Sequence, residues 1–287
     1  MLFRSNGSTW SKPSLLHPED GSAVYCTELS VMGDEVTAYL SLHNGYFLDW
    51  RCVMMKSYDS GHTWKNAGTP PHFPEYTFIR GTIFTQSGRI LIPYQHYETT
   101  REEHDRVMKL ACPTVLAEKI EFCETGVLIS EDGGKSFSRH IAAKLPMTSE
   151  WAWGEPTIAE LGDGKIVMLM RKDGEGVLQR TDSCDGGYTW SPFYATDIIN
   201  PDNKPRLISL PSGKVALLHT PCKHGARYPY ELWISSDGLE SWESKTRLTD
   251  FPGSYNYSDG FYENGHLHVV IEHNRHTVLY FDIELTV

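Results

Sequence analysis

The chain repeats an octapeptide, which is seen first as Ser57-Tyr58-Asp59-Ser60-Gly61-His62-Thr63-Trp64. Two good copies follow, Ser130-Glu131-Asp132-Gly133-Gly134-Lys135-Ser136-Phe137 and Ser183-Cys184-Asp185-Gly186-Gly187-Tyr188-Thr189-Trp190. A weaker copy begins at Ser235, and a remnant runs from Ser5 to Trp10. In such a turn the Asp and Ser side chains accept backbone N–H groups, glycine supplies the positive φ, and the final aromatic ring covers the turn. Copies spaced roughly 50 residues apart indicate a fold built from repeated supersecondary units.

Between the copies, short apolar strands alternate with turn residues. The third unit shows this pattern most clearly, with strands at 157–161, 165–170 and 177–181 and a Gly162-Asp163-Gly164 turn. Each unit is therefore predicted to be a small antiparallel sheet, and the chain to form one domain over residues 1–287. We count five complete units and expect residues 1–13 to supply the closing strand of the last one; the units span approximately 19–64, 74–137, 152–190, 203–242 and 255–287.

The bulk composition excludes several classes of protein. The formal net charge of −11 argues against a nucleic-acid partner, and no apolar run is long enough to span a membrane. The six cysteines have no metal-binding spacing, so neither a metal nor another cofactor is predicted. The first ten residues lack the apolar core of a signal peptide, so we expect a cytoplasmic protein with reduced thiols. An anionic ligand would need a local basic pocket to overcome the negative net charge.

The octapeptide is similar to the Asp-box of sialidases, and the chain resembles that family from end to end. The resemblance implies an all-β fold, the sialidase-like β-propeller. Family members have six blades whereas we count five units, so our interpretation is that this chain lacks the family's first blade. The resemblance also implies a carbohydrate substrate and a glycoside hydrolase that cleaves a terminal acidic or deoxy sugar.

Four residues match the family's functional positions. Glu155 precedes Pro156 and the Gly162-Asp163-Gly164 turn, and Arg171 follows 16 positions after Glu155, as in the family pattern. Arg227 stands before the strand that leads to the next box, and Tyr257 opens a Tyr-Ser pair near the start of the last unit. The resemblance implies that Tyr257 is the nucleophile, that Glu155 takes its proton, and that Arg171 and Arg227 bind an anionic group.

This chemistry explains the residue types. Guanidinium groups bind a planar carboxylate in a bidentate manner and stay charged. A phenol with a pKa near 10 is a poor nucleophile at neutral pH unless a carboxylate draws off its proton. The chain departs from the family in lacking a recognisable Arg-Ile-Pro strand and the Asp that acts as acid and base there; Asp49, shortly before the first full box, is our candidate for the acid.

Other polar residues fall where first strands of units end, and we expect them to face the same site. Three of these are further candidates for substrate binding, namely Arg80, His96 and Arg206. Histidines near strand ends, among them His43, His72, His96 and His219, leave open a polysaccharide lyase or another propeller glycosidase in which His96 or His43 moves the proton. A carbohydrate-binding propeller without catalytic activity is the third alternative.

Overall fold

The computed structural model describes residues 9, 12, 15–17, 21–43, 50–72, 76–98, 102, 105, 121–146, 153–223 and 225–286. The chain divides into two compact units, each of which is described by itself. Unit 1 comprises Met1–Thr82, Tyr94–Glu124 and Pro146–Trp151, and unit 2 comprises Ile83–Pro93, Thr125–Leu145 and Ala152–Val287. Within the described ranges, no helix is long and apolar enough to cross a lipid bilayer.

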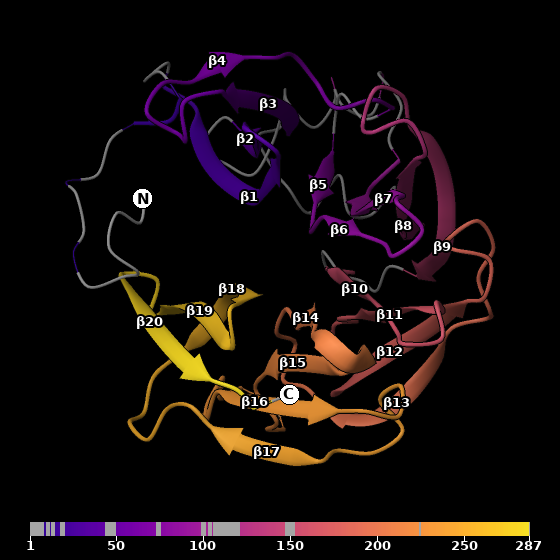
Figure 1. Ribbon diagram of the computed structural model, residues 1–287, viewed down its shortest axis with the longest axis vertical. Coiled ribbons are helices and arrows are strands. Elements are labelled where there is room, and N and C mark those ends of the chain that lie inside the picture. The colour runs from indigo at the N-terminus through magenta and orange to yellow at the C-terminus, as the bar shows by residue number, and fades with distance from the viewer. Residues whose placement is uncertain are drawn as a thin grey trace. The chain divides into compact units, whose positions relative to one another are not determined.

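The fold is an all-β propeller whose strands form five antiparallel sheets in the described part of the chain (Figure 1). In unit 1 the first sheet has the order β1(Ala23–Met32), β2(Glu35–His43), β3(Arg51–Ser57), β4(Lys65–Asn66). A further sheet, which is not confined to unit 1, has the order β5(Thr77–Ile79), β7(Ile90–His96), β8(Phe122–Ser130), β9(Ser138–Pro146), and β6(Ile83–Phe84) pairs with β7.

Three sheets lie in unit 2. The first has the order β10(Pro156–Glu160), β11(Ile166–Met170), β12(Val177–Ser183), β13(Tyr194–Ile199). The second has the order β14(Arg206–Ser209), β15(Val215–His219), β16(Glu231–Ser235), β17(Ser244–Arg247), with a short 3-10 turn at Pro211–Gly213. The third has the order β18(Tyr255–Glu263), β19(His266–His273), β20(Thr277–Glu284).

These five blades confirm the count made from the sequence. Four sheets extend beyond the predicted unit boundaries because a further strand follows each box. The predicted closing strand at 1–13 lies outside the described residues except for Thr9 and Lys12.

The repeated octapeptides form closed hydrogen-bonded turns. In the third copy, the Asp185 carboxylate accepts the Thr189 hydroxyl at 2.6 Å and the Thr189 amide at 2.9 Å. The Ser183 hydroxyl donates to Asp185 and accepts the Gly187 amide, each at 2.8 Å, and the Trp190 indole donates to the Gly187 carbonyl. The Thr189 bonds lower the pKa of Asp185 to about 2. The carboxylate of the octapeptide therefore stabilises its own turn and is not a candidate ligand-binding group.

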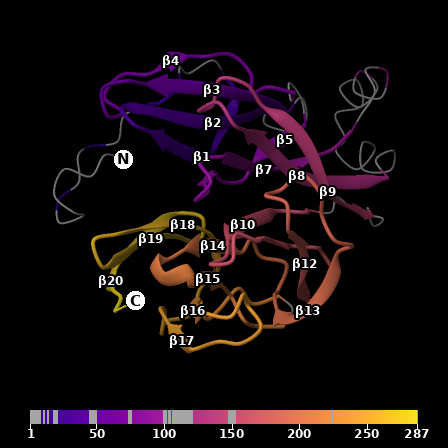
Figure 2. The ribbon, with the colours of Figure 1, turned by 45° about the vertical axis from the view of Figure 1, so that its right-hand side comes forward.

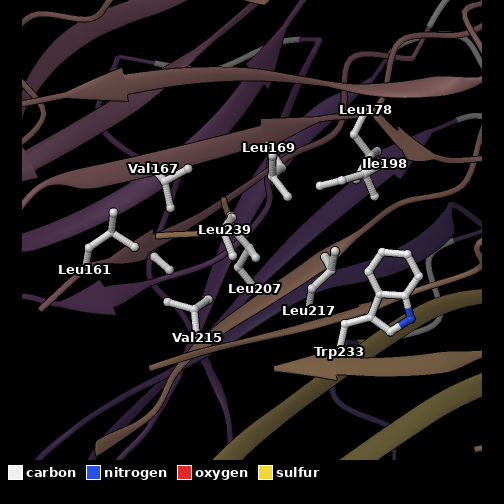
Figure 3. Close-up of a cluster of buried hydrophobic side chains, with 11 residues drawn as sticks. Leu161, Val167, Leu169, Leu178, Ile198, Leu207, Val215, Leu217, Trp233 and Leu239 are labelled. Atoms are coloured by element: carbon white, nitrogen blue, oxygen red, sulfur yellow. The ribbon is translucent and has the colours of Figure 1, made fainter. Parts of the chain in front are cut away.

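Unit 2 is held together by side chains packed between neighbouring sheets. One cluster joins the β10–β13 sheet, through residues such as Leu161, Val167 and Leu169, to Leu217 and Trp233 of the β14–β17 sheet (Figure 3). A second cluster fills the other face of the β14–β17 sheet and joins it to β18 and β19. Sheets covered on both faces favour almost uninterrupted apolar strands, as in β11, whose five residues are all buried. Polar side chains with a function are therefore confined to the ends of such strands.

The first strands of the three sheets, β10, β14 and β18, lie side by side in unit 2 (Figures 1 and 2). The Leu207 amide on β14 donates to the Thr157 hydroxyl on β10 at 2.9 Å, which fixes the offset between the two strands. Residues that stand just before or just after β10, β14 and β18 therefore lie close to one another.

Candidate functional site

Glu155 and Arg171 face one another across a hairpin. The β10–β11 ladder pairs Pro156 with Met170, and the Arg171 amide continues it by donating to the Glu155 carbonyl at 3.1 Å. The Arg171 guanidinium donates from Nη1 to Glu155 Oε2 at 2.9 Å. The Glu155 side chain is fully buried and that of Arg171 is 8% exposed, so this ion pair is shielded from water.

Asp173 completes the surroundings of Arg171. Its carboxylate accepts the Arg171 Nε–H at 2.5 Å and the Trp153 amide at 3.0 Å. Burial alone would lower the pKa of Arg171, but the carboxylates of Glu155 and Asp173 raise it above its usual value. Burial raises the pKa of Asp173, and the positive charge of Arg171 opposes that shift. The positive charge of Arg171 is thus offset by two carboxylates.

Arg227 is held differently, by neutral groups. Its guanidinium donates to the Asn256 side-chain oxygen at 2.6 Å and to the Asp202 carbonyl at 2.8 Å. Burial and then the nearby charge of Arg171 lower the pKa of Arg227, whereas Tyr257 and Glu155 act to raise it. Because neither hydrogen-bond acceptor carries a charge on the accepting atom, the positive charge of Arg227 remains available to an anion.

Tyr257 reaches the site through a β-bulge. The β18–β19 ladder pairs Tyr255 with His273 and then Ser258 with Ile271, so Asn256 and Tyr257 together oppose the single residue Glu272. A bulge of this kind redirects a side chain, and bulges are frequent beside active sites. The Tyr257 hydroxyl is close enough to both arginines for its charged form to raise their pKa values. Four predicted residues, Glu155, Arg171, Arg227 and Tyr257, therefore form one cluster within unit 2.

The remaining predicted residues have other surroundings. Arg206 is ion-paired with Asp259 on β18 at 2.9 Å. Arg80 and His96 belong to unit 1: Arg80 donates to the Gln95 side chain at 3.0 Å, and His96 shares a hydrogen bond of 2.7 Å with the Thr77 hydroxyl. Asp49, the candidate acid, lies outside the described residues.

Two residues of the cluster were not found from the sequence. Asp173 stands two positions after Arg171, just beyond the end of β11, and its carboxylate accepts the Nε–H of that guanidinium. Asn256 precedes Tyr257, and its amide links Arg227 to the Glu272 carboxylate, to which it donates at 3.2 Å. An acidic residue two positions from a buried arginine was the available signal for Asp173, whereas Asn256 depends on the bulge.

The histidines of the lyase alternative include two buried rings. His43 lies 4.4 Å from the Trp50 ring centroid and is buried, which lowers its pKa. His219 is fully buried against Trp233, and burial lowers its pKa to about 3. A ring that stays neutral and covered at neutral pH is poorly suited to exchange protons with a polymer.

The burial of His219 predicts a pH dependence of stability. The unfolded chain takes up a proton near pH 6.5 whereas the folded chain does so near pH 3, so stability is present above about 6.5 and is lost as the pH falls toward 3. Between pH 7 and 5 the native protein should lose about 2 kcal/mol more free energy of unfolding than the His219→Leu variant. Urea unfolding of both proteins at pH 7, 6 and 5 measures this; a constant difference between them would contradict it.

A separate polar pocket of about 390 Å³ lies at the opposite ends of the same strands. Its lining includes Asp163, Lys165, Arg180 and Glu240. Arg180 is ion-paired with Glu240 at 3.1 Å, and Lys165 lies 3.8 Å from Asp163. Both cations are offset by carboxylates, whereas in the Tyr257 cluster Arg227 donates to the neutral oxygens of Asn256 and of the Asp202 carbonyl. Within the described residues, no group of three His, Cys, Asp or Glu side chains is placed to hold a metal ion.

Comparison with known proteins agrees with this fold. The family model of the BNR repeat-like domain matches residues 1–269. A curated relative, a sialidase of Bacteroides fragilis (strain YCH46), is 26% identical over 246 residues, which are 79% of this chain and 40% of the relative. The chain thus spans well under half the length of that relative.

Solved structures show the same architecture. A sialidase of Trypanosoma rangeli in complex with sialic acid superposes with a TM-score of 0.68 at 16% identity, covering 96% of this chain and 46% of that one. A protein of unknown function from Dyadobacter fermentans DSM 18053 gives a TM-score of 0.67 at 16% identity, covering 93% of this chain and 77% of that one. At these identities the similarity establishes the fold alone.

Proposed function

Because this chain belongs to the family of BNR repeat-like domains, we propose that it is a sialidase-like glycoside hydrolase that cleaves a terminal acidic or deoxy sugar. The observation that carries the proposal is the cluster of Tyr257 with the buried Glu155–Arg171 pair and Arg227. A phenol near two guanidinium groups, one of which is ion-paired with a buried carboxylate, combines a nucleophile, an anion site and a candidate proton acceptor. The sialidase relatives make a carbohydrate the expected substrate.

In the proposed reaction, the Glu155 carboxylate accepts the proton of the Tyr257 hydroxyl. The phenolate oxygen bonds to the anomeric carbon while the glycosidic C–O bond breaks, and the leaving oxygen takes a proton from an acid, for which Asp49 is our candidate. Water then attacks the glycosyl–tyrosine and gives a proton to the deprotonated acid, and Tyr257 leaves and regains its proton from Glu155. Two displacements at one carbon return the original anomeric configuration.

In this reaction Arg171 and Arg227 bind the anionic group of the sugar. The positive charges of both guanidinium groups act on the Tyr257 phenolate, which favours its formation. The arginines would thus contribute to nucleophile activation as well as to substrate binding.

The test is a turnover assay of the purified protein on aryl glycosides of acidic and deoxy sugars, with the first-formed anomer identified by proton NMR. Release of the aglycone with retained configuration is expected. Inversion of configuration would contradict a tyrosine nucleophile. Absorbance growing near 235 nm on a uronate polymer would instead identify a lyase, and sugar binding by calorimetry without any turnover would identify a binding module.

A further inference from the structure

The hairpin turn between β19 and β20 carries an arginine in an unusual backbone conformation. Asn274 and Arg275 have φ values of 53° and 58°, and the His276 amide donates to the His273 carbonyl at 3.2 Å. Two successive residues in the left-handed region define a type I′ turn, whose second central position is usually glycine. Arg275 occupies that position, where its Cβ is disfavoured. Backbone strain of this kind is often found at functional sites.

Hydrogen bonds tie this turn to the Tyr257 cluster. The Asn274 side-chain oxygen accepts the Ser254 amide, and the Asn274 amide donates to the Ser254 carbonyl, each at 2.8 Å. The next residue, Tyr255, donates its amide to the Arg227 carbonyl at 3.0 Å. These hydrogen bonds connect the backbone of the turn to the backbone of Arg227, and the charge of Arg275 contributes to lowering the pKa of Arg227.

The two arginines differ from Arg171 in their charge balance. Arg171 is offset by Glu155 and Asp173, as described above. Arg227 donates to an amide oxygen and a carbonyl, and within the described part of the chain no carboxylate forms an ion pair with the exposed Arg275. Two cations of like charge repel each other, and an anion bound between them removes that repulsion.

We propose that Arg275 is a substrate-binding residue that, together with Arg227, receives the carboxylate of an acidic sugar. This inference rests on the proposed function for its substrate class, but it assigns a residue from the last hairpin turn that none of the family motifs includes. It also gives the site its selectivity: an acidic sugar gains from this pair of arginines, whereas a neutral sugar of the same shape does not.

The test measures binding and not turnover. Calorimetry with sialic acid and with its methyl ester compares the native protein with Arg275→Gly, which removes the guanidinium and places the preferred residue in the turn. We expect at least a tenfold weaker affinity of the variant for the acid, and the same affinity of both proteins for the ester. Arg247→Ala, an exposed arginine on β17, is the matched control and should bind the acid as the native protein does.

Three results would overturn the inference: native affinity of Arg275→Gly for the acid, an equal loss for acid and ester, or absence of acid binding by the native protein. An unchanged thermal midpoint of Arg275→Gly shows that the turn is intact. Because no step requires turnover, a protein that binds the acid in this way but hydrolyses nothing would refute the proposed hydrolase while supporting the role of Arg275.

Discussion

Phenylalanine in place of Tyr257 is expected to lower kcat by about 10³-fold or more, because it removes the proposed nucleophile and leaves the ring in place. Glutamine in place of Glu155 should lower kcat by about 10² to 10⁴-fold, the usual contribution of a general base. Neither change should weaken ground-state binding in proportion, since the arginines that hold the anion remain. Steady-state kinetics on the substrate found in the aryl-glycoside panel gives both parameters.

A matched control for the tyrosine change is Tyr262→Phe, which alters another tyrosine of the same strand β18 and should leave kcat unchanged. Intact-protein mass spectrometry with a fluorinated acidic-sugar substrate adds a direct readout. The native protein should gain the mass of one glycosyl group, and Tyr257→Phe should not. If Tyr257→Phe and Glu155→Gln both retain full turnover, the assignment of the nucleophile is wrong.

Much of the fold could be predicted from the sequence because the signals for it lie within short stretches of the chain. The Ser-x-Asp box closes through bonds within seven residues, so its copies identify the blades without knowledge of the contacts between them. The Glu155–Arg171 pair has the same character, since the Gly162–Gly164 turn sets the register that makes the two residues opposite each other. The pairing of residues across a hairpin can be predicted from the sequence when the position of the turn is clear.

The remaining parts of the cluster depend on features without a local signal. The bulge at Asn256 and Tyr257 appears only when β18 is paired with β19. The role that we propose for Arg275 depends on a turn anchored to Ser254, about twenty residues earlier in the chain. Arg206 was expected at the end of a strand, but in the structure it is the first residue of β14 and its charge is neutralised by Asp259 of the next sheet. Such pairings between strands cannot be obtained from the spacing within one unit.

Loss of the Arg171 side chain is expected to produce the largest stability effect among the site residues. In Arg171→Met the apolar stem is kept, but the fully buried Glu155 and the mostly buried Asp173 lose their shared cation. Breaking a buried ion pair from one side typically costs about 3–5 kcal/mol, because the other charge stays buried without compensation. Urea unfolding at pH 7 measures the difference, and Arg247→Met, on an exposed strand, should stay within about 0.5 kcal/mol of the native protein.

Two further measurements separate this electrostatic cause from simple loss of packing. The double variant Arg171→Met/Glu155→Gln removes one uncompensated charge and should recover part of the lost stability. Burial raises the pKa of Asp173 and the charge of Arg171 opposes that shift, so without the cation this pKa rises further; the deficit of Arg171→Met is therefore present at neutral pH and shrinks as the pH falls and the carboxyl group binds a proton. A packing defect would be independent of pH and would not be rescued by Glu155→Gln. A deficit that shows neither behaviour would mean that Arg171 is not the counter-charge that keeps Glu155 ionised, and Glu155 would then lose the basis for its role as proton acceptor.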